Sequence, residues 1–346
     1  MKEETNLYTK VKRYIAKNIY DGVYEEGMKI PSERALSEEL GVSRVTIRKS
    51  LQELEKDSLL IREVGVGTKI RFKNTGHAEV PEIINLVAPA RNPFFSEFID
   101  ELQMVLDKED VLLSYVQKSK GESIEDCLFR LYQRGLHNAI IWLQDMRIDI
   151  EKIKILRALG MNMTFFDADI NAPYADCIHL DNYLAIKELV KCLENKKAEQ
   201  LVYMGWDNEN VYSVRERRLA FEKYAQHKKK KICTLPWSER KQPTNKVNEI
   251  IDEIIKFDSQ ECISIICGDG EISILVGKIL REYNVSKHNI MSIDEFTDSN
   301  EYDITTIDQN FDETANRVWD TIKKQCESPK SWKAKSIQIK GNIINR

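Results

Sequence analysis

Apolar residues near the start of the chain recur with helical spacing. Val11, Ile15 and Ile19 are four residues apart, so they lie on one face of a helix predicted within residues 7–24. Polar and charged residues fill the positions between them. Gly22 follows this stripe and favours an end of the helix there. The segment therefore predicts an amphipathic helix with one buried side.

Two more short helices and a hairpin are predicted next. Ser32 can cap a helix that ends before Gly41. Ser43 can cap a third helix, whose apolar positions recur at i, i+4 and i+7. Residues 62–72 alternate around a Gly-x-Gly sequence, which is typical of a small β-hairpin. Helix, glycine turn, helix and β-wing is the order of a winged helix-turn-helix, and we assign residues 1–73 to such a domain.

The pattern changes after residues 74–82, which show no periodicity, contain Gly and Pro, and are predicted to be a linker. Beyond them, short apolar runs alternate with stretches of helical pattern, which predicts a parallel sheet with helices on both faces. Residues 83–346 are too many for one such sheet, so two α/β lobes are expected. The lysine run 228–231 is interpreted as a solvated surface stretch. The predicted strands are 83–88, 111–116, 139–143, 163–167, 200–205, 262–267 and 289–293.

Composition places the chain among globular proteins. Of its 346 residues, 42% are hydrophobic and 31% are charged. The sequence contains no run of about 18 apolar residues, so no membrane span is expected. The first residues lack the apolar core of a signal peptide, so secretion is not expected. The seven cysteines are scattered and contain no CxxC pair, so we expect reduced thiols in a cytoplasmic protein. Residues 1–76 carry 15 basic and 12 acidic residues, whereas the rest is acidic on balance, which permits a nucleic-acid-binding N-terminal domain.

Hydroxyl and guanidinium groups gather at the start of the third predicted helix. A helix N-terminus offers free amides to phosphate, hydroxyls bond phosphate oxygens, and arginine can bind guanine bidentately. Glycines in the hairpin allow close approach to the minor groove. For any single residue an ordinary surface position is the alternative, but the combined spacing favours DNA. The candidate DNA contacts are Arg34, Ser43, Arg44, Thr46, Arg48, Gly67 and Lys69.

This window resembles the GntR (gluconate-repressor-type) family of bacterial transcription factors. The motifs are P-S-E-R, then G-V-S-R-x-T-x-R, then G-x-G-T, within a nearly continuous match over residues 7–72. The resemblance implies the DNA contacts named above except Lys69, and a homodimer bound to a palindromic double-stranded operator. Ser58 stands where the family usually has glycine, which is expected to alter that turn slightly and leave DNA binding intact.

A second resemblance covers residues 83–346 and is to the LacI-type effector domain, itself similar to periplasmic sugar-binding proteins. The motifs that carry it, in chain order, are APARNPFFSEFIDEL, HLDNYLAIKELVKCL, SVRERRLAFEKY, CGDGEISILVGKILRE and ITTIDQNFDETA. Ala220 and Gly268 depart from the family pattern, in which Gly and Asn are usual. The resemblance implies two doubly wound lobes, three crossing segments near residues 178, 304 and 335, and a ligand cleft between the lobes.

The same resemblance implies a sugar, a sugar phosphate or a purine in the cleft. Arg217 matches the family's ligand-binding arginine and Asp294 its cleft aspartate. Planar polar groups bond paired hydroxyls and aromatic faces stack on sugar rings, so Phe94 and Phe95 on the first loop and Trp206 at a sheet edge are further candidates. Each candidate also has a structural alternative. The phenylalanines could pack in the core, and the tryptophan could have a lid or core role. Arg217 could lie at the surface, and Asp294 could cap a helix. The weaker candidates are Asp269, Asn182 and Gln309.

A ligand-responsive transcriptional regulator, most simply a repressor, is the leading interpretation. A GntR-type domain on a LacI-type body is the arrangement of repressors of arabinose use in Gram-positive bacteria, which implies L-arabinose or a related pentose as effector. A constitutive DNA-binding protein whose body only dimerises is the alternative. An enzyme is disfavoured because the sequence has no G-x-x-x-x-G-K-[ST], no G-x-S-x-G and no G-x-G-x-x-G after a strand. The five histidines lack metal-ligand spacing, so neither metal nor cofactor is expected.

Overall fold

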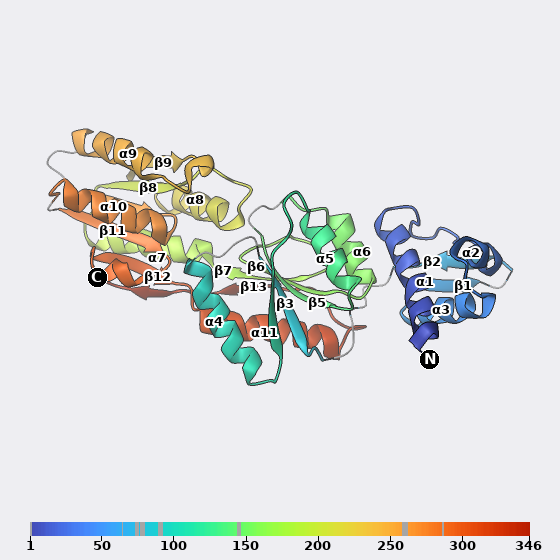
Figure 1. Ribbon diagram of the computed structural model, residues 1–346. Helices are drawn as coiled ribbons and strands as arrows, with labels where there is room; N and C mark the ends of the chain where they lie inside the picture. Colours follow the sequence, from blue (N-terminus) through green and yellow to red (C-terminus); the bar gives the residue numbers. More distant parts are fainter. Residues whose placement is uncertain are drawn as a thin grey trace.

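The chain folds into a small N-terminal domain followed by two α/β lobes (Figure 1). The computed structural model describes residues 2–63, 65–72, 76, 80–88, 93–143, 147–257, 262–285 and 287–346. The elements of the N-terminal domain are α1 (Lys2–Tyr20), α2 (Glu33–Leu40), α3 (Arg44–Lys56), β1 (Leu60–Glu63) and β2 (Gly67–Ile70). The predicted winged helix-turn-helix is confirmed in type and order.

The N-terminal domain owes its shape to apolar stripes and to capped helix ends. Val11, Ile15 and Ile19 of α1 are fully buried, as the spacing predicts. The Oγ atoms of Ser32 and Ser43 accept hydrogen bonds from backbone N–H groups in the first turns of α2 and α3, both at 3.2 Å. These bonds satisfy amides that have no partner within the helix.

The first helix and the turn before the wing differ in detail from the prediction. α1 begins before residue 7 and ends at Tyr20, just before the predicted stop at Gly22, which adopts a left-handed backbone with φ +75°. Ser58 also has a left-handed backbone, with φ +64°. That conformation explains why a glycine would suit the turn, since side chains disfavour it.

Lobe 1 is a six-stranded parallel sheet with helices on both faces, in the strand order β13-β7-β6-β5-β3-β4. α4 and α11 pack on one face, and α5 and α6 cover the other (Figure 1). Its strands are β3 (Ile83–Val87), β4 (Leu112–Val116), β5 (Asn138–Trp142), β6 (Asn162–Phe166), β7 (Asp176–Leu180) and β13 (Ser336–Ile339). Its helices are α4 (Pro93–Asp107), α5 (Ile124–Tyr132), α6 (Ile150–Ala158) and α11 (Phe311–Glu327).

Lobe 2 repeats this design in the order β14-β12-β11-β10-β8-β9, with β14 antiparallel to its neighbour. α7 and α8 cover one face, and α9 and α10 the other. Its strands are β8 (Gln200–Trp206), β9 (Lys229–Leu235), β10 (Ile263–Cys267), β11 (His288–Ile293), β12 (Ile304–Asp308) and β14 (Asn342–Ile344). Its helices are α7 (Asn182–Asn195), α8 (Tyr212–Tyr224), α9 (Thr244–Phe257) and α10 (Gly270–Glu282), with short 3-10 turns η1 (Trp237–Glu239) and η2 (Thr297–Asn300).

The chain passes between the lobes three times: from β7 to α7, from β12 back to α11, and from β13 to β14. β7 and β12 therefore end toward the opposite lobe, and the carboxyl ends of both parallel sheets face each other. Open α/β sheets bind ligands at such edges. The doubly wound, two-lobed fold class is thereby confirmed.

One surface stretch turned out to be a strand. Three lysines of the run 228–231 belong to β9, which is an edge strand of lobe 2 paired to β8 along seven residues. Lysines on an exposed edge strand discourage pairing with other chains, so their polarity hid a strand from a search for apolar runs. None of the described helices combines the length and hydrophobicity that a membrane span requires.

Candidate functional site

The N-terminal end of α3 holds four predicted DNA contacts at the surface. Ser43 Oγ accepts from the backbone N–H of Thr46 and lies 2.9 Å from Thr46 Oγ1, so the two hydroxyls are fixed side by side. Arg44 and Arg48 are exposed and stand four residues apart, on the same side of the helix. The structure thus collects hydroxyl and guanidinium groups on one outward face.

Carboxylates within the domain hold two of the candidate arginines. Arg48 donates to both carboxylate oxygens of Glu33 on α2, with 2.8 Å between Nη2 and Oε2. This hydrogen bonding lowers the pKa of Glu33. Arg34 pairs with Glu38 at 2.9 Å on the open surface, where its side chain is 78% exposed. When the protein binds DNA, phosphates or bases would have to replace these carboxylates as hydrogen-bond partners of Arg34 and Arg48.

The wing is a hairpin in which Glu63 pairs opposite Gly67. Gly67 has φ +117°, a backbone that side chains rarely adopt, while the space around it is open. Its glycine is therefore explained by conformation and not by crowding. Lys69 is half-buried and its Nζ lies 2.6 Å from Glu63 Oε2, so it is tied to the wing itself.

Val45 is a surface residue that the sequence reasoning missed. It lies between Arg44 and Thr46 on α3, and its side chain is 75% exposed. The signal was available, because Ile47 and Leu51 define the buried side of the helix and leave Val45 outside. An apolar side chain at this place suits contact with a thymine methyl group.

Arg217 is the centre of a buried polar cluster in lobe 2. It lies on α8 and is 6% exposed. Its Nε donates to Asn182 Oδ1 at 2.8 Å and its Nη1 donates to the Gly268 carbonyl at 2.7 Å. Burial with these bonds excludes the surface position that its charged neighbours in the sequence suggested. The structure brings Arg217 together with Asn182 at the carboxyl end of β10.

Two aspartates of lobe 2 belong to the same region. Asp294 follows β11; its Oδ2 accepts from the Gly270 N–H at 3.3 Å and its Oδ1 accepts from Gln309. Asp269 caps α10, and its Oδ2 accepts from Trp206 Nε1. Asp294 with Gln309 and Asp269 with Trp206 thus form two hydrogen-bonded pairs, which lie together because Gly270, whose N–H bonds Asp294, directly follows Asp269 in the chain. The tryptophan presents its ring edge to Asp269 and is itself buried.

Asp167 is the counterpart of Asp294 in lobe 1. It follows β6, which holds the same place in its sheet as β11 does, and both aspartates have left-handed backbones, with φ +51° and +77°. Each backbone N–H donates to the neighbouring strand, at Ile178 and Ile307. Ser213 of α8 donates to Asp167 Oδ2 at 3.1 Å, which joins the two lobes.

The other oxygen of this carboxylate, Asp167 Oδ1, is buried and has no hydrogen-bond partner among the described residues. An unsatisfied buried acceptor costs about 1–3 kcal/mol, and more when it is charged. The sequence reasoning missed this residue, because nothing local separates it from the nearby Asp169 and Asp176. Only strand pairing reveals that it is equivalent to Asp294.

Burial governs the electrostatics of the cluster. It raises the pKa of Asp167 and of Asp294, while the Arg217 guanidinium opposes the rise in both. Burial raises the pKa of Asp269 to about 6. Carboxylates that are removed from water in this way are strong hydrogen-bond acceptors for hydroxyl groups that replace water. Among the described residues no grouping of His, Cys, Asp and Glu suits a metal ion.

The predicted aromatic candidates on the first loop are only partly placed. Phe94 and Phe95 fall in the first turn of α4, at the carboxyl end of β3, and their side chains lie outside the described part of the structure. Their backbone position is at the edge of lobe 1 that faces lobe 2. Their role remains a prediction.

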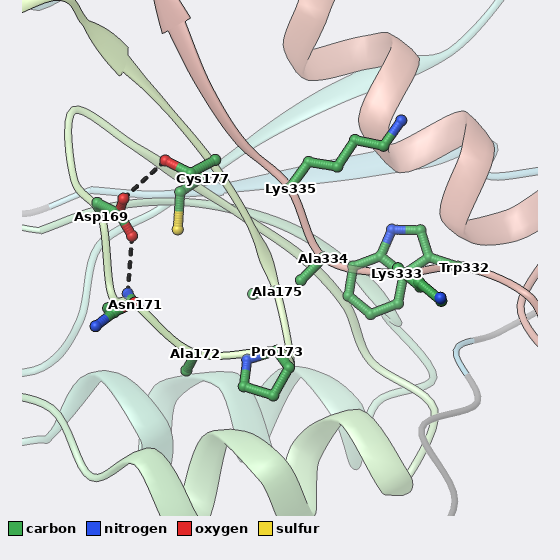
Figure 2. Close-up of a pocket in the computed structure, with 11 residues that line it drawn as sticks. Asp169, Asn171, Ala172, Pro173, Ala175, Cys177, Trp332, Lys333, Ala334 and Lys335 are labelled. Atoms are coloured by element: carbon green, nitrogen blue, oxygen red, sulfur yellow. Dashed lines mark hydrogen bonds between the residues drawn. The ribbon is translucent and has the colours of Figure 1, made fainter.

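A pocket of about 480 Å³ lies elsewhere on lobe 1, between the β6–β7 connection and the segment before β13 (Figure 2). Its lining contains none of the predicted ligand residues. At its rim, Ser336 Oγ donates to Asp169 at 2.7 Å and lies 3.2 Å from His179 Nε2. His179 packs edge-on against the ring of Tyr212 in lobe 2, with 4.8 Å between centroids. The rim is therefore a second place where the lobes touch.

The N-terminal fold and its exposed helix define a winged helix-turn-helix domain ahead of a two-lobed body. Residues 7–70 match the model of the family described as "Bacterial regulatory proteins, gntR family". The N-terminal domain is a GntR-type domain. The histidine utilization repressor of Pseudomonas aeruginosa is 39% identical over 172 residues, which are 49% of this chain and 64% of that protein.

The body has the fold of periplasmic binding proteins and LacI-type regulators. A solute-binding protein of an ABC transporter from Burkholderia graminis, solved with D-arabinose, superposes with a TM-score of 0.65 at 14% identity, over 78% of this chain and 96% of that chain. A LacI family regulator from Enterococcus faecalis, solved with ribose, gives 0.62 at 21% identity, over 76% and 97%. At these identities the likeness concerns the fold. Both resemblances inferred from the sequence are confirmed.

Proposed function

We propose that this protein is a cytoplasmic transcriptional repressor. It binds a palindromic DNA operator as a homodimer, and a sugar held between its lobes, L-arabinose or a related pentose, controls that binding. The observation that carries the proposal is the cluster of buried Asp167, Arg217 and Asp294 with half-buried Asp269 at the facing sheet edges, joined to a GntR-type domain. Catalysis is no part of it, because the matched relatives are regulators.

In this proposal residues 1–73 bind DNA through the start of α3 and through the wing, and residues 74–82 connect them to the effector body. Ser43 and Thr46 bond backbone phosphates, and Arg44 and Arg48 reach base edges in the major groove. Exposure of this face supports the assignment. Arg34 contacts phosphate from α2, while Gly67 and Lys69 act from the wing.

The ligand in this proposal bridges the lobes. Asp167 in lobe 1 and Asp294 in lobe 2 accept sugar hydroxyls, and Arg217 donates to one. Asn182, Gln309 and Asp269 orient these groups. Trp206, Phe94 and Phe95 supply apolar surface for the ring. A sugar fits because its adjacent hydroxyls both donate and accept, which a cluster of fixed carboxylates beside a guanidinium requires.

Exposed apolar side chains on lobe 1 support the homodimer. Met104 on α4, and Leu112 and Tyr115 on the edge strand β4, are 50%, 67% and 40% exposed. Large apolar side chains gathered at a sheet edge are typical of a protein–protein interface. A twofold-symmetric pairing there would present two N-terminal domains to the two halves of a palindrome.

The test is a thermal-shift panel of the purified full chain against pentoses, hexoses, their phosphates, disaccharides and purines. A ligand at 100 times its Kd stabilises the folded state by about 2.7 kcal/mol, which raises the melting temperature. We expect a hit among the pentoses that Arg217→Ala abolishes while DNA affinity is kept. A flat panel would instead support a body that only dimerises, and turnover of a bound compound would support an enzyme.

A further inference from the structure

An aromatic pair lies where the N-terminal domain meets lobe 1. Tyr20, the last residue of α1, stacks on Phe129 of α5, with ring centroids 4.1 Å apart and an interplanar angle of 4°. Its hydroxyl donates to Asp126 Oδ1 at 2.8 Å. Tyr20 and Phe129 are both 6% exposed. Tyr20 therefore lies between two domains.

Two lysines of α6 complete the contact by charge. Lys152 Nζ lies 4.9 Å from the centre of the Tyr20 ring and 3.5 Å from Asp126. Lys154 Nζ lies 3.4 Å from Glu26 of the N-terminal domain and 5.7 Å from the centre of the Phe72 ring. The face of α5 and α6 is thus complementary to the N-terminal domain in shape and charge.

This contact leaves the DNA-binding face free. The contacts named above lie at the end of α1, in the turn after it and at Phe72, two residues beyond β2. Arg34, Val45 and Arg48 stay exposed on the other elements of the domain. The N-terminal domain also lies at the end of lobe 1 away from lobe 2 (Figure 1). Contact with the body is therefore compatible with contact with DNA.

We propose that this face of lobe 1, formed by Asp126, Phe129, Lys152 and Lys154, is a docking surface for the N-terminal domain of the same chain, and that the docked form is the one that binds an operator. The inference rests on the proposed homodimer and palindrome. Two docked domains have a fixed spacing, so binding one half-site places the other domain at the second. Two undocked domains sample many orientations, and only a fraction of them fits both half-sites, which weakens apparent affinity by that fraction.

The β6–β7 connection links this surface to the interlobe cluster. It begins at Asp167, whose carboxylate contacts Ser213 of lobe 2. Farther along, Tyr174 packs against the hydrophobic cluster that also contains Tyr20 and Phe129. A ligand that moves Asp167 therefore acts on a segment that reaches the docked domain.

The experiment reverses charge on the lobe side, so that the DNA-binding domain keeps its own sequence. The full-length variant carries Lys152→Glu and Lys154→Glu. A control carries the same charge change on lobe 2, Lys187→Glu and Lys191→Glu. The probes are a palindrome selected from random DNA by the wild-type protein, and the same DNA with one half-site scrambled. Small-angle scattering without DNA measures docking, and fluorescence anisotropy measures affinity.

We expect the lobe 1 variant to show a larger radius of gyration and at least tenfold weaker binding to the palindrome, with half-site affinity within twofold of wild type. The lobe 2 control should match wild type. One further variant alters the N-terminal domain: adding Glu26→Lys to Lys154→Glu should restore the compact form and the palindrome affinity that Lys154→Glu alone reduces. An expanded wild type, or an expanded variant with full palindrome affinity, would overturn this inference alone. Selection that yields no twofold-symmetric DNA would overturn the proposed function and this inference with it.

Discussion

Asp167 provides a sharp test of the interlobe site, because its buried charge is expected to stabilise a bound ligand while it destabilises the ligand-free fold. The perturbation is Asp167→Asn, which keeps an acceptor for Ser213 and removes a buried charge whose second oxygen has no described partner. Burial raises the pKa of Asp167, which shows that its surroundings favour a neutral group. We expect the ligand-free variant to gain about 1 kcal/mol in free energy of unfolding. That gain corresponds to about 2–4 °C in melting temperature.

Asp176 is the matched control in the same lobe. It is also buried with a raised pKa, but its carboxylate accepts from the Lys335 N–H, Gln325 Nε2 and Trp332 Nε1, at 2.8, 2.7 and 3.0 Å. An amide cannot accept all three bonds, so Asp176→Asn should lower the free energy of unfolding by about 1–3 kcal/mol. Thermal denaturation without ligand should therefore move the two variants in opposite directions.

For ligand affinity we expect the opposite order, with Asp167→Asn as the more damaging of the two substitutions. A hydrogen bond to a charged group is worth about 1.5–3 kcal/mol, so Asp167→Asn should weaken binding of the sugar found in the panel by roughly 10- to 150-fold. Asp176→Asn should leave that affinity near wild type. Isothermal titration calorimetry measures both. The reasoning is refuted if both variants are destabilised alike, or if Asp167→Asn binds the sugar as tightly as wild type.

Three further outcomes are expected. Arg48→Ala should weaken specific DNA binding by about 1–3 kcal/mol in anisotropy titrations, and unchanged affinity would remove it from the recognition set. Ser58→Gly should stabilise the N-terminal domain by about 0.5–1 kcal/mol in urea unfolding, because φ +64° disfavours serine; a loss of stability would contradict this. Asp269 loses its proton near pH 4 when unfolded and near 6 when folded, so the folded state binds more protons in between. Stability should fall by about 2 kcal/mol as pH rises from 4 to 6, and Asp269→Asn should flatten that slope in thermal scans.

The sequence predicted the N-terminal domain well because its determinants are local. Ser32 and Ser43 cap the helices that directly follow them, and the recognition face follows from the position of one buried stripe. The lobes were also predictable, since their central strands are buried on both faces and appear as continuous apolar runs. The edge strand β9 was not, because its lysines lack that signature.

The residues that escaped prediction depend on contacts between distant segments. The position of Asp167 in the interlobe site depends on the pairing of β6 with β7 and on the hydrogen bond from Ser213 of the other lobe. Tyr20 lies next to Phe129, more than a hundred positions away in the chain. A single sequence carries no record of such pairs. The ligand candidates Arg217 and Asp294 were reached through the family resemblance; without it, the arginine would have been taken for a surface residue and the aspartate for a helix cap.

The late position of β13 and β14 has a consequence for synthesis and for mutation. Residues 336–344 supply an edge strand to each lobe, so neither sheet is complete until the ribosome has released both segments. The N-terminal domain contains all of its own elements and can fold long before that. A nonsense mutation shortly before residue 336 would therefore yield a fragment that keeps its DNA-facing helix while both lobes lack a strand. Such an allele is expected to occupy half-sites without answering to the effector.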